Sequence, residues 1–131
     1  SQFKFTLMKR LTLKIALLLV LLFVGLGVFA QNQNITNSLK SGNATELAKY
    51  FSSSVELVIL DDEDSYSKTE AKSKVNSFFT AKSPKGFSVK HEGTAPNGSK
   101  FIMGTLNTAK GSFRTYVVIK NKTIAELSFE Q

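Results

Sequence analysis

The C-terminal part of the chain restricts the fold most strongly, because strand-like segments alternate there with very short connections. Four segments rich in β-branched and aromatic residues cover 87–92, 101–108, 113–120 and 123–129. Asn97-Gly98 and Lys110-Gly111 in the connections accept the positive φ angles of tight turns, and Asn121-Lys122 leaves room only for a tight hairpin. Strands joined by hairpins are antiparallel, so the sequence predicts a four-stranded antiparallel meander. Gly104 interrupts the second segment and predicts a bulge or bend there.

Two short helices are predicted before residue 52. Ile35 and Leu39 lie one helical turn apart and are followed by Gly42, a pattern typical of a helix that ends in a glycine cap. Asn43 and Glu46 then form a variant of the capping box. The second helix is expected to place Ala44, Leu47, Ala48 and Phe51 on one face and to end at the serines 52–54.

A strand and the longest helix are predicted next. Residues 55–60 are apolar apart from Glu56, which indicates a strand covered on both sides, and the acidic residues 61–64 are expected to form its turn. The capping box Ser67-Lys68-Thr69-Glu70 starts a helix that continues to the break at Pro84. The apolar positions at helical spacing in this helix are Ala71, Val75, Phe78 and Phe79.

Helices followed by a meander indicate the α+β class. The order of elements resembles the nuclear-transport-factor-2-like superfamily, in which a cone of sheet surrounds a helix. Within that superfamily the chain resembles a bacterial family of small exported domains of unknown function, on residues 40–51 and on Thr69-Glu70-Ala71 leading to Phe78-Phe79. The resemblance covers about 35–129 and implies N-terminal helices and one long helix packed on a curved antiparallel sheet. A cystatin-like fold, with one fewer N-terminal helix, is the alternative.

Residues 1–30 have the pattern of a secretory signal peptide. Basic residues around position 10 precede an apolar run over 15–26, and small residues precede Gln31. We therefore expect cleavage between Ala30 and Gln31, an exported protein in the periplasm or outside the cell, and an upstream extension over 1–7. An uncleaved membrane anchor is the alternative. Residues 31–131 are then a single α+β domain, and membrane contact is expected only through the signal segment before cleavage.

Charge and cysteine content exclude several function classes. Four of the basic residues lie before position 31, so the formal charge of the rest is +3 rather than the +7 of the whole chain. The chain has no cysteine, which excludes disulfides and thiol catalysis. Basic and aromatic residues alternate in the meander, but export and the ordinary exposure of charges on a sheet argue against nucleic acid as a partner.

Catalytic signatures are scarce. His91 is the only histidine, and strand alternation places it on the face of Phe87 and Val89, pointing inward beside Tyr116 or Glu56. A partly buried imidazole near a carboxylate can act as a general base, so His91 is a candidate for proton transfer, and a strand-end histidine at the rim of the sheet is the alternative. The acidic residues 61–64 lack the spacing of a calcium loop. We expect a protein that is not an enzyme and holds no metal or cofactor.

Two binding modes fit the remaining residues. If Arg114, Tyr116 and Val118 share an exposed sheet face, they could form the interface of a homodimer. Alternatively, a small apolar ligand could occupy the cone, although the same residues could simply fill a core. The candidate pocket residues are Phe78, Phe79, Phe87, His91, Phe101, Met103, Phe113 and Tyr116. The sequence thus predicts a small exported, non-catalytic binding or scaffold domain.

Overall fold

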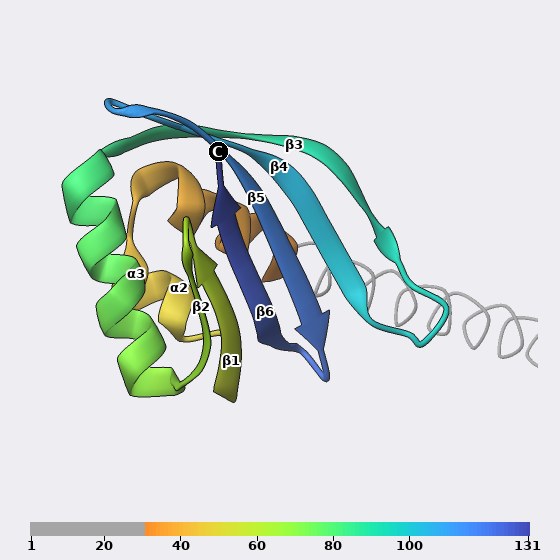
Figure 1. Cartoon of the computed structure of the whole chain (residues 1–131). Helices are drawn as coiled ribbons and strands as arrows, with labels where there is room; N and C mark the ends of the chain where they lie inside the picture. Colours follow the sequence, from red (N-terminus) through yellow and green to blue (C-terminus); the bar gives the residue numbers. More distant parts are fainter. Residues whose placement is uncertain (1–30) are drawn as a thin grey trace, which may run out of the picture. The chain divides into compact units, whose positions relative to one another are not determined.

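The computed structural model describes residues 31–131, which form helices and one six-stranded sheet (Figure 1). The elements are a helix over 31–41, α2 (Ala44–Ala48), β1 (Phe51–Ile59), β2 (Asp62–Ser67), α3 (Lys68–Lys82), β3 (Pro84–Thr94), β4 (Lys100–Thr108), β5 (Gly111–Lys120) and β6 (Thr123–Glu130). The predicted signal peptide lies outside the described residues. None of the helices within 31–131 is long and apolar enough to cross a bilayer.

The sheet has the strand order β2-β1-β6-β5-β4-β3. The predicted antiparallel meander is confirmed, since β3, β4, β5 and β6 pair consecutively and antiparallel. β1 pairs in parallel with β6, and β2 returns antiparallel to β1 as the edge strand. Residues Asn34–Gln131, which hold the whole sheet, form one compact unit. The α+β class is confirmed.

The predicted caps and turns are confirmed. The Asn43 side chain accepts a hydrogen bond from the Glu46 amide at 3.1 Å, and the Ser67 side chain accepts one from the Glu70 amide at 3.2 Å. Gly42, Gly98 and Gly111 have φ angles of 65°, 86° and 117°. In the β5–β6 hairpin, Asn121 and Lys122 have φ angles of 50° and 65°. Each of these signals acts within a few residues.

Two predicted boundaries are wrong. α2 ends at Ala48, and Phe51 and the serines 52–54 belong to β1, because Phe51 pairs with Ile124 and the Tyr50 carbonyl accepts a 2.6 Å hydrogen bond from the Ile124 amide. Residues 62–64 lie in β2 and not in the turn. Leu60 and Asp61 form the turn between β1 and β2. Acidic side chains are compatible with β2 because this edge strand is largely exposed to solvent.

The core lies between the helices and one face of the sheet, here called the inner face. α3 buries Ala71, Val75, Phe78 and Phe79 against it, as predicted. The Phe78 ring lies 5.2 Å from the Phe113 ring and 4.8 Å from the Phe129 ring. The opposite face, the outer face, carries no helix in the part of the chain that the structure describes (Figure 1). The prediction that β1 is covered on both sides is therefore wrong for its outer side, where Glu56 is exposed.

Candidate functional site

The eight predicted pocket residues do not come together. Phe78, Phe79 and Phe113 are buried in the core, and Phe87 is half-buried against it. The four others, His91, Phe101, Met103 and Tyr116, lie on the outer face. The core rings contact each other: the ring centroid of Phe78 lies 6.2 Å from that of Phe79 and 5.2 Å from that of Phe113. The inner aromatic residues therefore pack as a core, and a different group of residues forms the exposed surface.

His91 does not point inward, and the expectation that it shares a face with Phe87 is wrong. The register between β3 and β4 shifts between Val89 and His91, so strand alternation is interrupted there. His91 pairs with Met103, and its ring lies 5.4 Å from the ring of Phe101. Glu56, the expected carboxylate neighbour, lies on β1, which three strands separate from β3, and it accepts a hydrogen bond from the Ser65 hydroxyl.

Gly104 explains how the sheet accommodates this irregularity. It faces inward opposite Val89, and a Cβ placed on it would lie 2.6 Å from Cζ of Phe87 and closer still to the Ser88 carbonyl oxygen. Only glycine leaves room for the Phe87 ring and the bulged backbone at this point. The predicted bulge in the strand of Gly104 is wrong, because β4 pairs with β5 without a register shift and the bulge lies in the neighbouring strand β3.

Exposed apolar side chains are contiguous on the outer face. Met103 and Tyr116 are direct cross-strand partners and are 44% and 38% exposed, among the most exposed large apolar residues described. Phe101 pairs with Val118, and the Phe101 ring lies 6.4 Å from that of Tyr116. Val118 lies on the same face but is only 7% exposed, so it adds almost no surface for a partner. We call the residues that form this surface the outer patch: His91, Phe101, Met103 and Tyr116.

A depression of about 440 Å³ adjoins the outer patch. The side chains around it are Lys90, Met103, Thr105, Arg114, Tyr116, Ser128 and Glu130. Arg114 lies across from Glu130 in the β5–β6 register, with 3.9 Å between Nη2 and Oε2. The sequence predicts Arg114 and Tyr116 for this face but gives no sign of Ser128 and Glu130, because the positions of these two residues depend on the register between β5 and β6.

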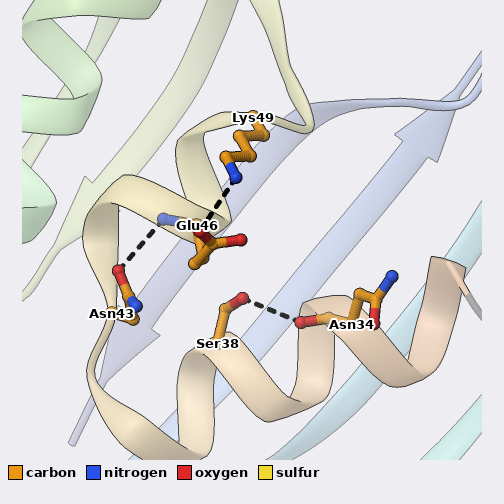
Figure 2. Close-up of polar contacts among 5 residues, drawn as sticks. All are labelled: Asn34, Ser38, Asn43, Glu46 and Lys49. Atoms are coloured by element: carbon orange, nitrogen blue, oxygen red, sulfur yellow. Dashed lines mark hydrogen bonds and ion pairs between the residues drawn. The ribbon is translucent and has the colours of Figure 1, made fainter.

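A second depression, of about 250 Å³, lies between the helix over 31–41 and α2. Its polar groups are engaged locally, as Figure 2 shows. The Ser38 hydroxyl donates to the Asn34 carbonyl at 2.8 Å, Asn43 caps α2, and Lys49 Nζ donates to Glu46 at 2.9 Å. The hydrogen bond to Glu46 raises the pKa of Lys49. The first of these contacts lies within a helix and the other two lie in α2 and at its ends, so these polar groups already have partners close in sequence.

The acidic segment holds a hydrogen-bonded pair. The Tyr66 hydroxyl donates to Oδ2 of Asp62 at 2.8 Å, and this bond to a carboxylate raises the pKa of Tyr66 to about 12. Lys74 of α3 lies over the Tyr66 ring at 5.2 Å and 3.9 Å from the Asp62 carboxylate. The segment thus attaches β2 to α3. Within residues 31–131, no three carboxylate or imidazole groups gather as a metal site would require.

Known proteins share this fold. A crystal structure of a DUF4783 family protein from Bacteroides fragilis is 33% identical over 75% of this chain and 95% of that chain, with a TM-score of 0.69. Another, from Bacteroides ovatus, is 29% identical over 75% of this chain and 92% of that chain, with a TM-score of 0.70. No curated protein sequence matches the chain.

More distant structures show the fold alone. An NTF2-like protein of unknown function from Cytophaga hutchinsonii is 9% identical over 76% of this chain and 84% of that chain, with a TM-score of 0.56. An uncharacterised cystatin fold protein from Novosphingobium aromaticivorans is 9% identical over 78% of this chain and 96% of that chain, with a TM-score of 0.58. Both fold types that the sequence suggested are therefore structural neighbours.

The predicted resemblance to a bacterial family of unknown function is confirmed, whereas export remains a prediction. Residues 32–130 match the model of a family described as "Domain of unknown function (DUF4783)". This match covers almost the whole described part of the chain and includes every residue of the outer patch. The chain therefore belongs to the DUF4783 family, a family of α+β domains with NTF2-like and cystatin-fold structural neighbours.

Proposed function

We propose that this chain is an exported, non-catalytic binding domain that binds another protein through the outer face of its sheet. The observation that carries the proposal is the contiguous outer patch on a face that no described helix covers. Removal of such a patch from water lowers the free energy of the system, and contiguous exposed apolar surfaces commonly mark interaction sites. Aromatic residues and methionine are also enriched in protein interfaces.

A protein partner on the outer face is better supported than a small apolar ligand among the inner aromatic residues. The inner aromatic residues pack against each other, with Phe78 in contact with both Phe113 and Phe129. The exposed apolar residues lie instead on an open sheet, beside a depression large enough to accept a side chain of a partner. The available contact surface is therefore broad and open.

The surroundings of His91 support a non-catalytic role. A general base needs a group that orients it and a substrate position within hydrogen-bonding distance. His91 is exposed, its described contact is with the ring of Phe101, and none of the described hydrogen bonds or ion pairs joins it to a carboxylate. In the proposed role, His91 contributes a flat ring at the edge of the outer patch.

Native mass spectrometry of the protein purified from its own bacterium tests the proposal. The wild-type protein is expected to begin at Gln31 and to retain a protein partner. The double variant Met103→Gln/Tyr116→Gln is expected to be recovered without one, because it removes apolar surface without adding charge. The control Ser73→Gln/Asn76→Gln changes exposed positions of α3 and should keep the partner. A wild-type protein that retains no protein partner, or a partner lost only in the α3 variant, would contradict the proposal.

A further inference from the structure

We propose that the partner at the outer face is a second copy of this chain, related by a twofold axis that runs parallel to the strands between β5 and β6. This inference rests on the proposed function and names its partner. It is carried by the separation of charge on the outer face, which divides the sheet at the boundary between β5 and β6.

Basic and acidic side chains occupy different halves of this face. Lys90, Arg114 and Lys120 lie on β3 and β5 and are exposed. The exposed or half-exposed acids Glu126 and Glu130 lie on β6, with Glu56 on β1 and Glu63 on β2. Strand alternation and register place Arg114, Lys120 and the four acidic residues on the outer face with Tyr116 and Met103. Lys90 lies at the register shift of β3 and lines the depression beside Met103 on this face.

Such a pattern selects one arrangement of two copies. Sheets that pack face to face lie about 10 Å apart, and a twofold axis relating them lies in the plane between them. An axis perpendicular to the strands would place the basic half of one copy on the basic half of the other. An axis along the strands places the basic half on the acidic half. Complementary charges fix orientation, while like charges across an interface are unfavourable.

One row of residues across the outer face shows which side chains this arrangement brings together. One row across the outer face runs through six residues, one from each strand: His91, Met103, Tyr116, Ser128, Val58 and Glu63. An axis between Tyr116 and Ser128 reverses this row in the second copy. Met103 then faces Val58 of the second copy, an apolar contact, and His91 faces Glu63.

The adjacent row brings opposite charges of the two copies face to face. Arg114 and Glu130 are cross-strand partners on either side of the axis. In the second copy their order is reversed, so each Arg114 faces a Glu130 of the other copy. Both side chains are largely exposed in the single chain, and their 3.9 Å ion pair leaves the guanidinium able to bind a second carboxylate. Four alternating charges would then surround the axis.

Charge reversals provide the test, with each variant made in the full chain and studied by sedimentation velocity at low salt. Arg114→Glu and Glu130→Arg should each weaken self-association by about tenfold or more, because each change occurs twice in a symmetric dimer. An equal mixture of the two variants should form heterodimers more tightly than either variant alone forms homodimers, because opposite charges then face each other. Lys72→Glu, on an exposed position of α3, is the matched control and should leave the dissociation constant unchanged.

Three results would overturn the inference. A dimer strengthened by Arg114→Glu would indicate the other axis, and a dimer unaffected by any outer-face variant would indicate another surface. A wild-type protein that stays monomeric at all concentrations would exclude a second copy as partner. In that last case, a different protein that copurifies with the chain from its native bacterium would still support the proposed binding function. Failure of the second-copy inference can therefore be distinguished from failure of the proposed function.

Discussion

At the residue scale, Gly104 shows most clearly how one position shapes the sheet. Its missing side chain makes room for the Phe87 ring and for the bulge in β3 that turns His91 to the outer face. Sequence reasoning could identify Gly104 as an irregularity because glycine in a strand is costly. It could not place the bulge in the neighbouring strand, because that placement depends on contacts between strands.

Replacement of Gly104 by alanine should destabilise the domain by about 2 kcal/mol, since the added Cβ would clash with backbone and with Phe87. Urea unfolding followed by circular dichroism measures this loss. Gly86→Ala is the control, because a Cβ there meets no atom within 4 Å. Equal stability of Gly104→Ala and the wild type would show that the close packing around Gly104 does not occur in solution.

Tyr66 should titrate well above an ordinary tyrosine. Its hydroxyl donates to Asp62, which raises its pKa to about 12, so the hydrogen bond contributes stability below about pH 10, the ordinary tyrosine pKa. That contribution is lost as the pH rises from about 10 through about 12. Tyrosinate absorbance at 295 nm, compared between the wild type and Asp62→Asn, measures the shift. A Tyr66 pKa that is the same in both proteins would argue against the hydrogen bond.

At the scale of elements, local signals were predictable and pairings between distant strands were not. The cap at Ser67 and the turn at Asn121-Lys122 follow from a few neighbouring residues. The parallel pairing of β1 with β6 joins residues about 70 apart in sequence, and nothing local specifies it. The register between β5 and β6 also shifts, because Ile119 pairs with Ile124 and Val118 with Glu126, so that Tyr116 lies opposite Ser128. The positions of Ser128 and Glu130 on the outer face therefore required the structure.

The N-terminus of α3 is expected to depend on its cap. Ser67→Ala should lower the free energy of unfolding by about 1 kcal/mol, because the Glu70 amide loses the side chain that accepts its hydrogen bond. Thermal and urea unfolding measure the change. Ser73→Ala, in the exposed middle of the same helix, should be neutral or slightly stabilising. A loss of the same size in both variants would mean that the cap has no special role.

At the scale of the whole molecule, the helices cover one face of the sheet and leave apolar residues on the other. If the outer face binds a second copy, the folded dimer is favoured by mass action, and the melting temperature should rise with protein concentration. The variant Met103→Gln/Tyr116→Gln should have a melting temperature independent of concentration. Differential scanning calorimetry over a hundredfold range of concentration measures both. A wild-type melting temperature that does not change with concentration would argue against self-association.

Cross-linking between the copies tests the central claim most directly. The chain has no cysteine, so Ser128→Cys introduces a single thiol close to the proposed twofold axis. The two thiols of a dimer would lie on either side of the axis, diagonally across sheets about 10 Å apart, within reach of a short bismaleimide. Ser73→Cys on α3 is the control. The account predicts a rapidly cross-linked dimer for Ser128→Cys and mainly monomer for Ser73→Cys, whereas equally slow cross-linking of both variants would contradict it.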